Sequence, residues 1–174
     1  RAEVTNNSHY DVLDLTELPE DYLPRTIYVP NVGAAEYRSR APKVPWAAPD
    51  ERDSVVDYYR LVVNRGIGPT SERTIQPAVG SPGPAHIDGV YSYIFSGERL
   101  MLLATATWAA LPSDFFIKTT GAGDFRPNLA RWVPIIERGP LADAATARLL
   151  LSVCLTSAYA DLWQRHAAFE WAEE

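Results

Sequence analysis

The sequence has little cysteine and no long run of apolar residues. Cys154 is the only cysteine, so no intramolecular disulfide can form, and its apolar surroundings favour a small buried side chain. No apolar run approaches the roughly 18–20 residues that span a bilayer, and the first residues lack signal-peptide architecture. These absences predict a soluble protein of a reducing compartment, the cytoplasm. Because the chain begins with Arg1 and not Met, we expect it to be a piece of a longer protein.

Basic residues are also scarce. The chain carries 16 Lys and Arg against 22 Asp and Glu, a net charge of −6. Proteins that bind nucleic acid on their own usually carry a basic surplus, because phosphate neutralisation supplies most of the affinity. The charge therefore counts against strong independent DNA binding. It still allows a module that reads bases while a partner domain holds the DNA backbone.

Catalytic and metal-binding motifs are missing too. Asp114 and Lys118 suit a nuclease motif, but Phe116 stands where the second carboxylate is needed. No Gly-x-Ser-x-Gly nucleophile elbow occurs. His86 and Asp88 could offer two ligands to a metal, but the four-ligand set of a structural zinc site is absent. The sequence gives no positive argument for catalysis.

Hydrophobic periodicity predicts an α+β fold within the size range of one domain. We expect strands at 57–65, 74–79, 87–95 and 114–118, a helix at 97–110 and a turn at 119–123. The first 50 residues contain prolines that should break every possible helix, with one short strand at Arg25–Val29. The sheet should be small and mixed, with one inserted helix.

A C-terminal helical arm is predicted from Leu141 to Glu174, where neither Pro nor Gly occurs. The arm should be one long helix or two nearly continuous ones. Its core-facing stripe should comprise Leu151, Leu155, Ala158, Leu162 and Phe169. We therefore divide the chain into a module at 1–140 and an arm at 141–174.

The segment Phe116–Phe125 contains Gly121-Ala122-Gly123 after a predicted strand, as in the S-adenosylmethionine loop of a Rossmann-type domain. Only about 50 largely helical residues follow it, too few for the remaining βα units of a doubly wound sheet. A strand-to-loop connection is the stronger interpretation.

Basic and amide side chains gather in two loop regions, 65–86 and 118–131. Arg and Asn are the side chains that contact guanine and adenine edges through two hydrogen bonds. Each such residue alone is more often solvated surface. The residues are Arg65, Arg73, Lys118, Arg126, Asn128 and Arg131.

Several segments between about 55 and 165 resemble the region after the catalytic domain in type IIG-like adenine DNA methyltransferases and in those of BREX and DISARM phage-defence systems. The similar segments are Tyr59–Arg65, Ser71–Val79, Pro82–His86, Ser113–Lys118 with Gly121 and Leu129, Trp132–Pro134 and Leu155–Trp163. Their order and spacing carry the resemblance.

The resemblance implies a target-recognition domain, which selects the DNA sequence that a separate catalytic domain methylates. The chain lacks the Asn-Pro-Pro-Tyr or Asp-Pro-Pro-Tyr tetrapeptide of such catalytic domains, so we expect no methyltransferase activity and no cofactor here. S-adenosylmethionine would bind only the parent's catalytic domain. The expected partners are double-stranded DNA and that domain. The candidate DNA-binding residues are Arg65, Arg73, Thr74, His86, Lys118, Arg126, Asn128 and Arg131.

Two alternatives remain. The first is a protein–protein interaction or scaffold domain of a defence complex, with part of its five Trp and nine Tyr at an interface. The second is a small S-adenosylmethionine-dependent enzyme that uses the 119–124 loop.

Overall fold

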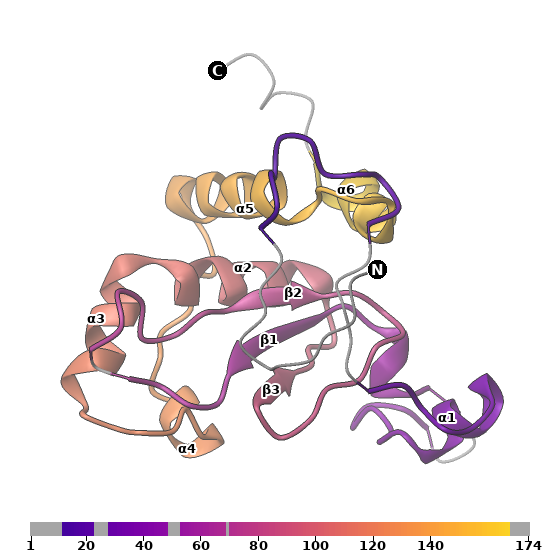
Figure 1. The fold of residues 1–174 in the computed structure, drawn as a ribbon. Coiled ribbons are helices and arrows are strands. Elements are labelled where there is room, and N and C mark those ends of the chain that lie inside the picture. Colours follow the sequence, from indigo (N-terminus) through magenta and orange to yellow (C-terminus); the bar gives the residue numbers. More distant parts are fainter. Residues whose placement is uncertain (1–11, 23–27, 49–52, 69, 168–174) are drawn as a thin grey trace.

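The computed structural model describes residues 12–22, 28–48, 53–68 and 70–167. Helix α2 (Glu98–Ala109) lies between a small sheet on one side and α5 (Pro140–Val153) on the other, and α6 (Ala160–His166) lies beside α5 (Figure 1). Helix α4 (Pro127–Ala130) lies at the opposite end of the molecule from α6 (Figure 1). The α+β class with a small sheet is confirmed.

The sheet has three strands, β1 (Arg60–Asn64), β2 (Ala78–Gly80) and β3 (Val90–Tyr93), in the order β2-β1-β3. Both pairings are antiparallel, so the expectation of a mixed sheet is wrong for the described residues. Strands β1 and β2 follow each other as an antiparallel pair, and the connection from β2 to β3 then crosses β1, so that β3 pairs along its other edge. All three strands also precede α2, so no helix is inserted between them.

The predicted strands at 57–65, 74–79 and 87–95 exist but are shorter. The segment before β2 leaves the sheet because the backbone N–H groups of Thr74 and Ile75 donate to the Asp114 carboxylate. Of the strand expected at Arg25–Val29, residues 25–27 lie outside the described residues, and Tyr28 and Val29 are not in a strand.

The strand predicted at 114–118 is helical instead. Residues Leu111–Thr119 form helix α3, and Pro112 lies in its first turn. Proline ends a helix that precedes it, but it suits the first turn of the next helix. The N–H groups of a first turn have no acceptor within the helix, so the lack of an N–H in proline costs no hydrogen bond there. The Ser113 hydroxyl donates to the Thr107 carbonyl at 2.7 Å, which joins the start of α3 to the end of α2.

Helix α1 (Ala34–Arg40) corrects the expectation that prolines exclude helices from the first 50 residues. It fits between Pro30 and Pro42, which leave eleven proline-free residues. The Glu36 and Arg40 side chains form an ion pair one helical turn apart, which supports so short a helix.

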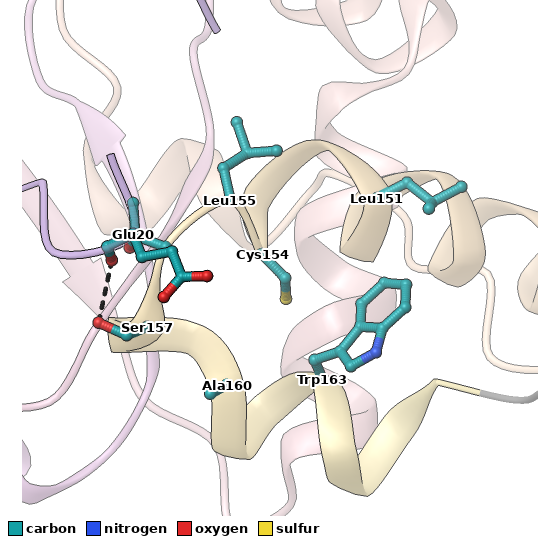
Figure 2. A pocket seen from close by; sticks show the side chains of 8 residues that line it. Glu20, Leu151, Cys154, Leu155, Ser157, Ala160 and Trp163 are labelled. Carbon is teal, nitrogen blue, oxygen red and sulfur yellow. Dashed lines mark hydrogen bonds between the residues drawn. The ribbon is translucent and has the colours of Figure 1, made fainter. Parts of the chain in front are cut away.

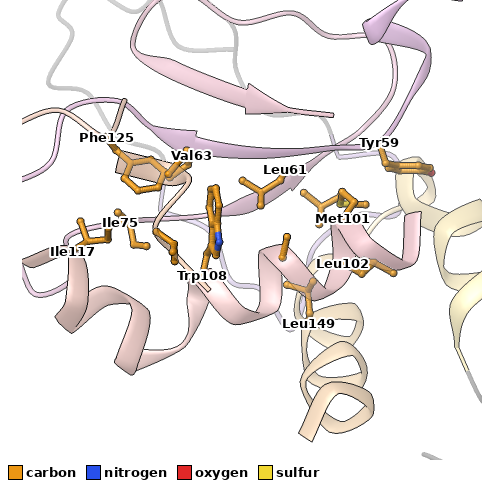
Figure 3. Packing of buried hydrophobic residues seen from close by; sticks show 14 of the residues in the cluster. Tyr59, Leu61, Val63, Ile75, Met101, Leu102, Trp108, Ile117, Phe125 and Leu149 are labelled. Carbon is orange, nitrogen blue, oxygen red and sulfur yellow. The ribbon is translucent and has the colours of Figure 1, made fainter. Parts of the chain in front are cut away.

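The core lies between the sheet and α2 (Figure 3). The predicted burial of Tyr59, Leu61 and Val63 is confirmed, but Arg60 between them is also buried, so the alternation is not strict. Helix α2 matches the predicted 97–110 helix closely and buries Trp108 near its end. The Thr105 hydroxyl donates to the Met101 carbonyl, so this polar side chain is satisfied inside the core.

The C-terminal arm contains two helices with a break at 154–159, which includes the short 3-10 helix Ser157–Tyr159. Two hydrogen bonds hold the break against the body. The Tyr159 hydroxyl donates to the Val79 carbonyl, and the Tyr59 hydroxyl donates to the Ala158 carbonyl, both at 2.9 Å. These two hydrogen bonds accompany the interruption of the predicted helix at 154–159, a segment that contains no Pro or Gly.

The predicted stripe of the arm is largely wrong because the break resets the helical phase. Leu162 is fully buried, but Leu151 is 58% exposed and Leu155 is 36% exposed. Ala158 is exposed, and Phe169 lies outside the described residues. The buried residues of α5 are instead Ala142, Thr146, Leu149 and Leu150.

Within the described ranges, no single helix is long and apolar enough to cross a membrane. Helices α2 and α3 would meet both criteria only as a pair, with a 65° bend between them.

Candidate nucleic-acid interface

The two loop regions that hold the candidate residues come together at the end of β1. Gly66 pairs with Asp124 as an isolated antiparallel bridge. The Phe125 N–H donates to the Arg65 carbonyl at 2.7 Å, and the Ile67 N–H donates to the Gly123 carbonyl at 3.0 Å. Segments 65–67 and 123–125 therefore run side by side, although residues 68–122 lie between them along the chain.

Phe125 fixes this junction in the core. Its side chain is fully buried, and its ring meets that of Trp108 edge-on, with centroids 5.3 Å apart. Figure 3 shows the ring beside Val63. Arg126 follows Phe125 directly, so the buried ring fixes the backbone position from which the exposed Arg126 side chain extends.

Carboxylates hold two of the candidate arginines. Arg65 contacts Asp88 and lies 3.6 Å from Asp124, and these two charges raise the pKa of Arg65. Arg126 donates two hydrogen bonds to Asp124, at 2.8 and 3.2 Å. Hydrogen bonding from Arg126 is also the main reason that the pKa of Asp124 is lowered. Both guanidinium groups are thus oriented, and part of their charge is balanced.

Three candidate side chains on and beside α4 face solvent. The Arg126 side chain is 56% exposed, and Asn128 and Arg131 are also exposed. Trp132 follows with 69% of its surface exposed. This stretch presents a guanidinium, an amide, a second guanidinium and an indole within seven residues.

Arg73 and Thr74 have structural contacts instead. An Arg73 guanidinium nitrogen donates to the Ala109 carbonyl at the end of α2, and its Nε lies 3.7 Å from the Asp114 carboxylate. Thr74 is 2% exposed, so its side chain does not form part of the surface. Lys118 donates to the Ser71 carbonyl at 3.0 Å. These contacts fasten the 71–75 loop to α2 and α3.

The main anchor of that loop could not be predicted from the sequence. The Asp114 carboxylate accepts from the N–H groups of Thr74, at 2.7 Å, and Ile75, at 2.9 Å. The sequence suggested Asp114 only as half of an incomplete nuclease motif. Its two backbone contacts, in a residue only 5% exposed, show a structural role that no local pattern predicts.

His86 is exposed beside the sheet edge, and its Nε2 lies 2.8 Å from the Ser92 hydroxyl. Across the described residues, no group of three or more His, Cys, Asp or Glu side chains is placed to hold a metal ion. The nearby Asp88 is engaged with Arg65.

The Gly121-Ala122-Gly123 loop follows helix α3 and not a strand. Gly121 has a φ of +65°, which suits glycine at the end of a helix. These residues therefore do not form the strand, glycine loop and helix on which a Rossmann-type cofactor site is built.

Cys154 is the single thiol, and it lies half-buried in the break between α5 and α6. Burial raises the pKa of the Cys154 thiol to about 11. At neutral pH the group is therefore a thiol and not the thiolate that nucleophilic chemistry requires.

No protein-family model, curated protein or solved structure matches this chain.

Proposed function

We propose that this chain is a DNA target-recognition module of a restriction–modification or phage-defence adenine methyltransferase and is not catalytic by itself. The observation that carries the proposal is the exposed group of Arg126, Asn128 and Arg131 at the junction of the two loop regions. Arginine recognises guanine and asparagine recognises adenine in the major groove, each through paired hydrogen bonds.

Orientation supports base reading more than general attraction to DNA. Asp124 holds the Arg126 guanidinium by two hydrogen bonds, and the buried Phe125 fixes the backbone before it. A side chain fixed in this way loses little freedom when it binds. Asp88 and Asp124 also balance part of the arginine charge, which limits sequence-independent attraction to phosphates.

The overall charge of −6 is consistent with a module that selects the DNA sequence while another domain binds the DNA backbone. In this proposal the module selects the sequence in the cytoplasm. A separate catalytic domain supplies the basic surface, the S-adenosylmethionine and the methyl transfer.

The test is selection of bound sequences from a random duplex library by the purified chain at low salt. The expected result is an enriched motif whose binding falls as salt rises. The variant Arg126→Ala should lose enrichment at one position of that motif. A bound pool with no enriched sequence, or the same motif from the wild type and the variant, would overturn the proposal.

A protein-interaction scaffold is the second candidate, and helix α3 favours it. Leu111 is 70% exposed and Phe115 is 68% exposed one turn later, so both lie on one side of the helix. Retention of a partner protein by the wild type and not by Phe115→Asp, with no DNA selectivity, would favour the scaffold function.

A further inference from the structure

A cleft opens between α5 and α6. Helix α6 lies at the opposite end of the molecule from α4 (Figure 1). Its volume is about 470 Å³, and Figure 2 shows the side chains around it. Its apolar lining comes from Leu151 on α5, Leu155 after it and Trp163 on α6, with Ala160 and Cys154 between them.

The large apolar side chains of this cleft are accessible to solvent. Leu151 is 58% exposed, Leu155 is 36% exposed and Trp163 is 38% exposed. Single exposed apolar residues are normal on a protein surface, but apolar residues grouped in one hollow mark a binding site. Aromatic residues such as Trp163 are enriched in protein interfaces.

The cleft has an acidic rim at Glu20, the one charged side chain among the described residues that line it. Glu20 lines the cleft, and its carbonyl accepts hydrogen bonds from the Ser157 N–H at 2.8 Å and the Ser157 hydroxyl at 3.0 Å. The segment 12–22 around it contains four carboxylates and no Lys or Arg. Asp161 adds a further carboxylate next to Ala160.

We propose that the α5–α6 cleft binds a cationic amphipathic segment of a partner protein. The partner's apolar side chains would enter between Leu151 and Trp163, and its Lys or Arg side chains would lie along the acidic segment 12–22. Apolar burial supplies the affinity, and charge complementarity selects a basic segment over an acidic one. This site is separate from the arginine-bearing surface and does not depend on the DNA proposal.

The probe is a fluorescently labelled amphipathic helical peptide with Leu on one face and Lys on the other. A matched peptide carries Glu in place of Lys. Fluorescence anisotropy should show saturable, stoichiometric binding of the Lys peptide at micromolar concentrations. The Glu peptide should bind at least about tenfold more weakly, since like charges meet the acidic rim.

Two variants test the two parts of the cleft. Leu151→Asp should weaken binding of the Lys peptide by about tenfold or more. The control Leu111→Asp changes a leucine on α3 that is more exposed than Leu151, and it should leave peptide binding unchanged. The combined variant Glu17→Gln, Glu20→Gln and Asp21→Asn should bring the affinities of the two peptides together. Arg126→Ala changes the proposed DNA surface and not the cleft, so it should not alter peptide binding. Peptide binding therefore tests the cleft proposal independently of the DNA proposal.

Three results would overturn the cleft proposal. The first is equal affinity for the Lys and Glu peptides, and the second is equal weakening by Leu151→Asp and Leu111→Asp. The third is sedimentation that shows a dimer of this chain which Leu151→Asp dissociates, because a second copy would then occupy the cleft.

Discussion

Phe125 meets Trp108 edge-on, with ring centroids 5.3 Å apart and ring planes at 80°. This contact joins the loop that carries Arg126 to the helix in the middle of the fold. A change at the buried ring should therefore affect both the stability of the fold and the surface beside it.

We expect Phe125→Ala to lower the free energy of unfolding by about 3–5 kcal/mol, because it removes a fully buried aromatic side chain and leaves a cavity. Urea unfolding followed by circular dichroism measures this loss. Phe115→Ala is the matched control, because Phe115 is 68% exposed and its loss should change stability by no more than about 0.5 kcal/mol. Similar losses for the two variants would contradict the packing described for Phe125.

Asp114 gives a second test of the fold. Its carboxylate accepts from two backbone N–H groups, so Asp114→Ala should cost about 1–3 kcal/mol of unfolding free energy by leaving them unpaired. Asp114→Asn keeps one acceptor oxygen and should lose less. Asp143→Ala removes a carboxylate paired with Arg99 on the surface and is the control. Equal stability of Asp114→Ala and Asp143→Ala would show that Asp114 does not anchor the loop.

The parts of the fold that could be predicted from the sequence are those in which the spacing of apolar side chains is enough to determine the element. The alternation of Tyr59, Leu61 and Val63 predicted a strand buried on one face, and the apolar spacing around Trp108 predicted α2. At Pro112 the pattern failed, because proline marks a helix end and also suits the first turn of the next helix. Only packing against the 71–75 loop distinguishes these outcomes.

The candidate site was predictable in residue type but not in arrangement. The sequence identified Arg65 and Arg126 but not the carboxylates that hold them. Asp88 and Asp124 reach Arg65 only through contacts between distant segments, whereas Asp124 stands two residues before Arg126 and that pair is local. The burial of Thr74 likewise depends on the distant Asp114. Contacts between residues far apart in sequence determine the arrangement of the site, and local sequence patterns do not reveal such contacts.

The ion-pair cluster of Glu98 predicts a dependence of stability on pH. Burial alone would raise the pKa of Glu98, but hydrogen bonds from Arg165 and His166 outweigh it, so the pKa is lowered from its ordinary value of 4.5. A lowered pKa in the folded state stabilises the protein above pH 4.5, and this contribution is lost as pH falls through the folded-state pKa.

Glu98→Gln should therefore lower stability at pH 7, and its difference from the wild type should shrink in acid. Thermal unfolding from pH 7 down to pH 3 measures this. Glu36→Gln removes an exposed ion pair on α1 and serves as the control. A constant difference between Glu98→Gln and the wild type at every pH would show that the cluster does not titrate with folding.

For the proposed DNA surface, Arg126 and Arg131 should give different results. Arg126 is oriented by Asp124, so we expect it to read a base, and Arg126→Ala should cost about 1–3 kcal/mol at one base pair and relax specificity there. We expect Arg131 to contact phosphate, so Arg131→Ala should weaken binding equally on all sequences and reduce the salt slope by about one. Binding to selected and single-mismatch duplexes measures both, with Arg40→Ala on α1 as the control. Wild-type affinity and discrimination in both variants would exclude this surface as the DNA contact.

Variants of two neighbouring leucines on α5 can distinguish the packing observed for the arm from the apolar stripe that its sequence predicts. Leu150 is fully buried and Leu151 is 58% exposed, although the sequence pattern placed Leu151 in the core. Leu150→Ala should therefore cost about 2–5 kcal/mol, and Leu151→Ala no more than about 0.5 kcal/mol.

Leu150 and Leu162 both belong to the hydrophobic core cluster. Deletion of 141–174 should therefore destabilise the chain more than either point variant does and leave a remainder without fixed tertiary packing. Urea unfolding measures the two point variants, and near-ultraviolet circular dichroism with dye binding measures the deletion. A larger loss from Leu151→Ala than from Leu150→Ala would restore the predicted stripe. A soluble deletion variant with cooperative unfolding would show that the arm does not belong to the core.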